Sequence, residues 1–186
     1  MTDTFKLVTD TLLAPAGLET SDIDRLMGRL VSQDIDYADL YFQYSRQEGW
    51  MLEDGAVKSG SRSTDQGVGL RAVSGEKTGF AYSDEFVLPA LAQAADAARA
   101  IAKSGGSTSP VQWRNAKSPS LYTPADPLSS LSDQDKVELL QAVEVQARAC
   151  DPRVSQVMAS LAAVHDVGLV ARGDGQMTAD VRPLVR

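Results

Sequence analysis

The chain has 186 residues, 43% of them apolar, and carries a net charge of −7. This length suggests a single domain with a sizeable core, and the negative charge argues against binding nucleic acid or an anionic membrane, because both need clustered Lys and Arg. Cys150 is the single cysteine, and the sequence has neither a signal peptide nor an apolar run of membrane-spanning length, so we expect no intrachain disulfide and a cytoplasmic protein.

The N-terminal residues predict two helices. Apolar side chains recur at helical spacing from Phe5, and Pro15 ends the first run. Ser21 is the expected cap of the second helix, with Asp24 three residues later. One face of that helix is apolar and contains Ile23, Leu26, Met27, Leu30 and Val31.

The segment DYADLYFQYS, residues 36–45, changes to an alternation of period two, which predicts a strand. Its inward face is expected to hold Ala38, Leu40, Phe42 and Tyr44. Asp54-Gly55 then separates two short extended runs. This dipeptide favours a type I′ hairpin turn, which needs positive φ at both central residues.

The glycine-rich segment 64–85, TDQGVGLRAVSGEKTGFAYSDE, raises the question of a phosphate-binding loop. GVGLRA matches G-x-G-x-x-G/A, but that fingerprint binds a dinucleotide only where a strand passes into a helix. GEKT lacks the glycine directly before lysine that a P-loop requires. We therefore expect two strands joined by Gly75-Glu76, with Gly67, Gly69 and Gly79 marking bulges or close backbone contacts.

The alanine-rich residues 86–106 predict a slim helix that can approach a sheet closely, with Pro89 in its first turn and Lys103 in its last. A long Ser/Pro-rich connector, 104–131, follows. Ser132 is the expected cap of another helix, which ends at Asp151-Pro152. Its inward face is expected to contain Val137, Leu140, Val143 or Glu144, and Ala147.

The remaining residues predict strands, with a hairpin turn at residues 173–176. The sequence thus predicts one α+β domain over residues 1–186: N-terminal helices, an antiparallel hairpin-rich sheet, two packing helices and C-terminal strands. The last strand places Met177, Ala179, Val181 and Pro183 on one face. We expect self-association through this C-terminal edge strand, because unpaired backbone groups beside an apolar patch invite strand addition.

Candidate chemistry is sparse. His165 is the only histidine, and no H-x-x-x-H, H-E-x-x-H or C-x-x-C spacing accompanies it or Cys150. His165 is therefore expected at a surface or rim, and the acidic pairs at residues 53–54 and 84–85 are expected to be solvated turn residues. The residues predict no catalytic, cofactor-binding or metal-binding site in this segment.

Several long motifs resemble the N-terminal part of the TldD/PmbA family of zinc metallopeptidases. They are DYADLYFQYS, DQGVGLRAVSGEKTGFAY, the stretch SLYTPADPL at residues 120–128, and DGQMTADVRPLVR at residues 174–186. The resemblance runs from about Leu12 to Arg186 and is loosest over residues 105–117.

The resemblance implies a cytoplasmic protein that pairs with a PmbA/TldE-like subunit and degrades or trims unfolded peptides; some members were named as modulators of DNA gyrase. Zinc is held in the family by an H-E-x-x-x-H motif and a cysteine of the C-terminal half, where the Glu would act as general base on metal-bound water. None of these positions matches here, since Asp166 follows His165 and no His-Glu pair occurs.

The resemblance thus implies a non-catalytic N-terminal part that contributes to a partner interface and a substrate chamber, inactive alone and without zinc of its own. The alternative is a stand-alone peptide- or protein-binding module without proteolytic activity. A nucleotide-binding protein is the third possibility, and the missing helix after GVGLRA argues against it.

Overall fold

The computed structural model describes residues 4–31, 35–102, 114–115 and 121–186. The chain divides into two compact units. The first unit comprises residues 1–44, 66–121 and 167–181, and the second comprises residues 45–65, 122–166 and 182–186. Among the described residues, no helix is long and apolar enough to cross a membrane.

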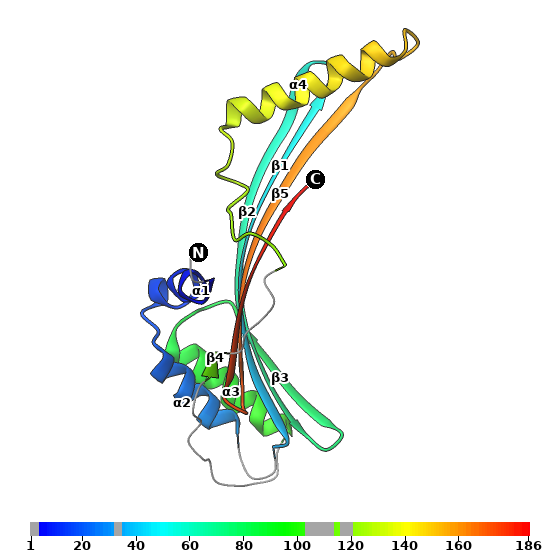
Figure 1. Cartoon of the computed structure of the whole chain (residues 1–186). Coiled ribbons are helices and arrows are strands. Elements are labelled where there is room, and N and C mark those ends of the chain that lie inside the picture. Colours follow the sequence, from blue (N-terminus) through cyan, green and yellow to red (C-terminus); the bar gives the residue numbers. More distant parts are fainter. Residues whose placement is uncertain (1–3, 32–34, 103–113, 116–120) are drawn as a thin grey trace. The chain divides into compact units, whose positions relative to one another are not determined.

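The elements can be followed in Figure 1. The helices are α1 (Thr4–Leu12), the short 3-10 helix η1 (Ala14–Ala16), α2 (Thr20–Leu30), α3 (Leu88–Ala102) and α4 (Asp133–Cys150). The strands are β1 (Tyr37–Glu53), β2 (Ala56–Ser74), β3 (Lys77–Ser83), β4 (Arg114–Asn115), β5 (Met158–Arg172) and β6 (Gln176–Val185). They form one sheet in the order β3-β2-β1-β5-β6-β4. The α+β prediction is confirmed, with one parallel pair, β4 with β6, that the antiparallel prediction did not include.

Tight turns connect the long strands as predicted. Asp54 and Gly55 join β1 to β2 with φ of 46° and 77°, so both central residues have the positive φ of a type I′ turn. Ser74 pairs with Lys77 across the turn from β2 to β3, and Gly75 has a φ of 54°. This hairpin answers the question of the glycine-rich segment: no helix begins beside Gly75, so the helix N-terminus that a phosphate loop needs is missing there.

Helix caps were predicted correctly for α4 and wrongly for α2. Ser132 caps α4, and its hydroxyl accepts from the backbone N–H of Asp135. In α2 the capping box is formed by Glu19 and Asp22, and Ser21 already lies inside the helix. The helix starts earlier because Glu19 and Asp22 can bond reciprocally to each other's backbone N–H groups. The predicted role of Lys103 lies outside the described residues.

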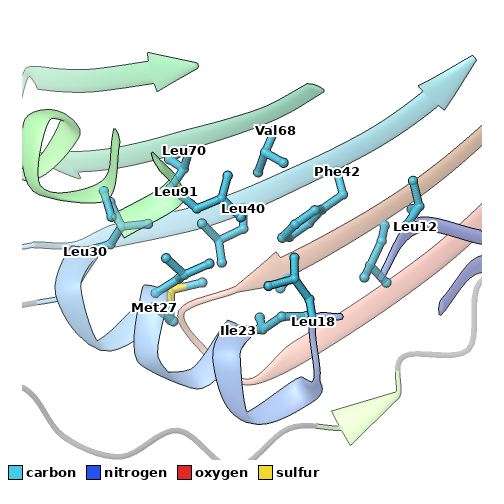
Figure 2. Close-up of a cluster of buried hydrophobic side chains, with 14 of the residues drawn as sticks. Leu12, Leu18, Ile23, Met27, Leu30, Leu40, Phe42, Val68, Leu70 and Leu91 are labelled. Carbon is cyan, nitrogen blue, oxygen red and sulfur yellow. The ribbon is translucent and has the colours of Figure 1, made fainter. Parts of the chain in front are cut away.

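The core of the first unit lies between α1, α2 and α3 and one face of the sheet. Figure 2 shows Leu40 and Phe42 of β1, together with Val68 and Leu70 of β2, pointing toward the helices. The helices contribute Leu12, Ile23, Met27, Leu30 and Leu91, all fully buried. The period-two pattern of β1 is thereby confirmed.

Glycines within the strands make room for neighbouring groups. A Cβ atom at Gly79 would lie 1.9 Å from the carbonyl oxygen of Ala98, so helix α3 approaches strand β3 backbone to backbone. The rings of Tyr82 and Phe80 cover Gly67 and Gly69. The prediction of a close backbone contact is confirmed at Gly79, whereas side chains and not backbone lie against Gly67 and Gly69.

The second unit has a smaller apolar cluster of Leu52, Leu140 and Ala159, on which Trp50 and Leu161 pack. The predicted inward face of α4 needs correction. Leu140 and Glu144 are buried, but Val143 is 49% exposed, and Lys136 is buried instead. Charged side chains point inward here because partners on the sheet compensate their charges, as described below.

The C-terminal strand follows the predicted alternation in part. Met177 and Val181 are buried, whereas Leu184 and Val185 are exposed. Self-association through this strand stays a prediction. Val181 is only 3% exposed, so a charge placed there would disturb the core before it tested an edge contact.

Candidate functional site

A pocket of about 330 Å³ opens in the second unit. Residues 46–48 of β1 and 62–64 of β2 form its walls, and residues 128–129 of the connector close one side. The lining residues are Arg46, Gln47, Glu48, Arg62, Ser63, Thr64, Leu128 and Ser129. Two guanidinium groups and three hydroxyl groups make this lining rich in hydrogen-bond donors.

Glu48 is the centre of a buried ionic network at this pocket. Its side chain is 3% exposed, and its Oε1 lies 2.7 Å from Nζ of Lys136, which is also 3% exposed. Trp50 Nε1 donates to the same oxygen at 2.5 Å, and Arg62 Nε donates to Oε2 at 3.0 Å. Both carboxylate oxygens therefore have partners, which a buried carboxylate needs.

Helix α4 is tied to the connector by the same network. Lys136 Nζ donates to the carbonyl oxygen of Leu128 at 2.8 Å, and Arg62 Nη2 donates to Asp133 at 2.5 Å.

Burial by itself raises the pKa of Glu48, but hydrogen bonds from Lys136, Trp50 and Arg62 outweigh it, and the pKa is lowered. The stabilisation from this ionised carboxylate is present above the unfolded pKa of about 4.3 and is lost as the pH falls through the lower folded value.

Arg46 connects the pocket to a second charged group. Its Nη2 donates to Asp126 Oδ2 at 2.7 Å and approaches His165 Nδ1 at 3.3 Å. Burial opposes ionisation of Asp126, yet the hydrogen bond from Arg46 and one from the backbone of Leu128 lower its pKa. The arginine therefore holds the connector against the strands through an ionised carboxylate.

His165 is buried, with 6% of its surface exposed, so the prediction of a surface or rim position is wrong. A guanidinium can only donate, so Nδ1 must accept, and the proton of neutral His165 is on Nε2. Nε2 is buried, and no group in the part of the chain that the structure describes forms a hydrogen bond with it. Burial lowers the pKa of His165, and Arg46 adds to this, while Asp126 and Asp166 oppose it.

The pKa of His165 predicts that stability falls on mild acidification. The folded chain favours neutral His165, so its contribution is complete above the unfolded pKa of about 6.5 and is lost as the pH falls below that value. Urea unfolding between pH 7.5 and 5 should show a falling midpoint. His165→Gln should flatten the curve, because the chain has no other histidine. If the urea midpoint of the variant falls with pH as steeply as that of the wild type, another titratable group causes the pH dependence.

The described residues do not fit a zinc site. Within them, no three His, Cys, Asp or Glu side chains are grouped so that they could hold a metal ion. Cys150 is exposed on α4, and His165 directs Nδ1 toward a guanidinium, which is incompatible with zinc bound at that nitrogen.

A second polar cluster lies in the first unit, on the sheet face opposite the helices. Arg71 forms two hydrogen bonds to Asp39, and Tyr37 donates to the same carboxylate at 2.8 Å. The guanidinium groups of Arg71 and Arg172 lie 5.3 and 5.8 Å from the centre of the Tyr37 ring. These contacts fix three neighbouring strands to one another, a structural role.

Sequence reasoning identified none of the pocket residues. Arg46 and Glu48 lie in RQEGWMLE, residues 46–53, where polar and apolar residues do not alternate, so the sequence gives no contrast between the two faces of the strand. The available signal was the spacing of two residues that places Glu48 and Trp50 on the same face of β1 as the buried Leu52. The partners come from β2, the connector and α4, and no local pattern links those segments.

Two family models match the chain. The model described as PmbA/TldA metallopeptidase domain 1 matches residues 38–102. The PmbA/TldA metallopeptidase central domain matches residues 126–186. Most of the sheet and all of α4 lie within these two matches.

Curated relatives extend the match over nearly the whole chain. The Metalloprotease TldD homolog of Haemophilus influenzae is 47% identical over 181 residues, which are 96% of this chain and 38% of the relative. A relative of the same name from Buchnera aphidicola subsp. Acyrthosiphon pisum is 36% identical over 98% of this chain and 38% of its own length. The chain thus spans about two fifths of the relatives it matches.

Solved structures share the fold. TldE from Thermococcus kodakarensis superposes with a TM-score of 0.58 at 15% identity, covering 89% of this chain and 38% of that one. A Thermotoga maritima protein solved as a candidate modulator of a DNA gyrase gives a TM-score of 0.66 at 14% identity, over 88% and 37%. At these identities the likeness concerns the fold alone.

Proposed function

The chain belongs to the TldD/PmbA family as the N-terminal part of a TldD-like metallopeptidase, and from this premise we propose that it is the non-catalytic part of a peptide-processing enzyme. Its proposed role is to form part of the partner interface and of the chamber that admits extended peptides. The zinc and the general base would be supplied by residues outside this segment.

The observation that carries the proposal is the extent of the match. The chain aligns over 96% of its length with a metalloprotease homologue of which it spans 38%, and the two matched models are a first and a central domain of a metallopeptidase. A segment of that kind is expected to position substrate and partner for chemistry that other residues perform.

The proposed partner is a PmbA/TldE-like subunit. The fold of this chain resembles a TldE structure, so two related subunits could present related surfaces. Helix α4 offers exposed apolar side chains for such a contact, among them Leu139 and Val143, which are four residues apart on one face and are 46% and 49% exposed. Exposed apolar groups gathered on one element are typical of interaction sites.

A stand-alone binding module is the second candidate function. The donor-rich pocket favours it, because such a pocket can hold a ligand without catalysing a reaction. The two functions predict different results for a longer protein with a downstream segment: the peptidase part gains zinc and peptide cleavage, whereas the binding module binds peptides without cleaving them.

We predict that the 186-residue chain binds no stoichiometric zinc and cleaves no unfolded peptide, whereas the longer protein that contains it, with its PmbA/TldE-like partner, does both. Elemental analysis after dialysis against a weak chelator measures the metal, and a fluorogenic unfolded peptide reports cleavage. The matched control is His165→Ala in the longer protein, which should retain its zinc because His165 is not proposed as a ligand.

Two results would contradict the proposal. Peptidase activity of the isolated chain that His165→Ala abolishes would place chemistry inside this segment. A longer protein that contains zinc but still binds and does not cleave peptides would favour the binding module.

A further inference from the structure

We propose that the pocket of the second unit is a carboxylate-binding subsite that takes a carboxylate of a peptide, held by Arg46 and Arg62. The carboxylate chemistry follows from the pocket itself, whereas the choice of a peptide as its source rests on the proposed function. The family models and relatives assign no ligand to these residues.

The first step is the supply of donors. Arg46 uses only Nη2 in its hydrogen bonds to Asp126 and His165, and Arg62 uses Nε and Nη2 for Glu48 and Asp133, within the described part of the chain. A guanidinium has five N–H donors in a planar fork. Arg62 therefore keeps both hydrogens of Nη1 and one of Nη2, and Arg46 keeps Nε and Nη1 for single charge-assisted hydrogen bonds to a carboxylate.

The second step is the state of the acidic residue in the lining. Glu48 is buried, and its two oxygens already accept from Trp50, Arg62 and Lys136. Its charge is balanced by the buried ammonium group of Lys136, so it adds little repulsion toward an incoming anion. The ionic network also fixes Arg62 in place, which limits the side-chain entropy lost on binding.

The third step is size and orientation. A volume of about 330 Å³ equals the liquid volume of roughly ten water molecules, enough for one or two peptide residues but too small for a folded partner. Thr64, on the same face of β2 as Arg62, and Ser129 add hydroxyls to this lining that can donate to a second carboxylate oxygen or accept from a peptide N–H.

The test is a titration of the isotopically labelled 186-residue chain, followed by amide chemical shifts. Four probes are compared: acetyl-Ala-Ala-Ala with a free C-terminus, the same peptide as its C-terminal amide, acetyl-Ala-Glu-Ala amide, and acetate. We expect the amide to bind at least about tenfold more weakly than a peptide that carries a carboxylate, because a charge-assisted bidentate contact is lost. Binding of the first peptide alone identifies a C-terminal carboxylate, and binding of the glutamate peptide identifies a side chain.

Two variants locate the site. Arg46→Gln should weaken carboxylate binding at least about tenfold. Thr64→Trp, at an exposed position on the same face of β2 as Arg62, should fill the pocket with a similar loss while leaving the ion pairs intact, and it remains informative if Arg46→Gln fails to fold. The matched control is Arg29→Gln, since Arg29 is another ion-paired surface arginine, outside the second unit. It should bind as the wild type does.

The proposal is overturned if all peptides bind equally, if none binds at millimolar concentration, if acetate binds as tightly as the peptides, or if Thr64→Trp has no effect. No metal and no turnover are needed for this readout. A longer protein without peptidase activity would therefore leave the subsite standing, and a failed titration would leave the metallopeptidase proposal standing.

Discussion

Replacing Lys136 with methionine is expected to destabilise the chain by about 3 kcal/mol, the lower end of the cost of breaking a buried ion pair, because Glu48 keeps Arg62 as a second partner. Glu48 and Lys136 are each 3% exposed and lie 2.7 Å apart. Methionine nearly preserves the side-chain volume but removes the ammonium group and its hydrogen bond to Leu128. Urea unfolding followed by circular dichroism measures the loss.

The double variant Glu48→Gln/Lys136→Met separates the charge effect from packing. It should recover much of the stability, because removing both charges leaves no uncompensated ion. Lys58→Met is the matched control: Lys58 is an exposed lysine of the same unit, and its replacement should change stability by less than about 0.5 kcal/mol. A loss at Lys136 no larger than that at Lys58 would show that the ion pair is not needed for folding.

Local sequence patterns predicted the elements well because the physics that creates them is local. Asp54-Gly55 determines its turn through positive φ, and the alternation from Ala38 to Phe42 determines which face of β1 is buried. The wrong cap of α2 has a similar local cause, since Glu19 and Asp22 compete successfully with Ser21 for the same role.

The pocket could not be predicted in the same way. Its charged residues come from two strands separated by a turn, their charged partners come from the connector and from α4, and each looks like an ordinary solvated charge in sequence. Lys136 lies in the helix pattern where an apolar residue is expected, and only Glu48, 88 positions away along the chain, explains it. His165 was misjudged for the same reason: Arg46 donates to its Nδ1, and no spacing rule connects the two residues.

At Gly79 the fold depends on the absence of a side chain. A Cβ atom there would lie 1.9 Å from the carbonyl oxygen and 2.9 Å from the carbonyl carbon of Ala98, and 3.0 Å from the backbone nitrogen of Ala102. These neighbours are backbone atoms of α3, so no rotamer change can make room. Gly79→Ala should therefore push α3 away from β3 and destabilise the chain by about 3 kcal/mol, at the upper end of overpacking effects.

Gly28→Ala is the matched control, because it adds the same methyl group inside α2, where no described atom beyond the helix's own neighbouring backbone lies within 4 Å of the new Cβ. Alanine there should stabilise the chain by about 0.5–1 kcal/mol through helix propensity. The two substitutions should thus shift the urea midpoint in opposite directions. Equal shifts would mean that α3 can move away from the strand at little cost. The face of α3 that buries Leu91, Ala95 and Ala98 would then be less tightly packed against the sheet than the backbone contact at Gly79 implies.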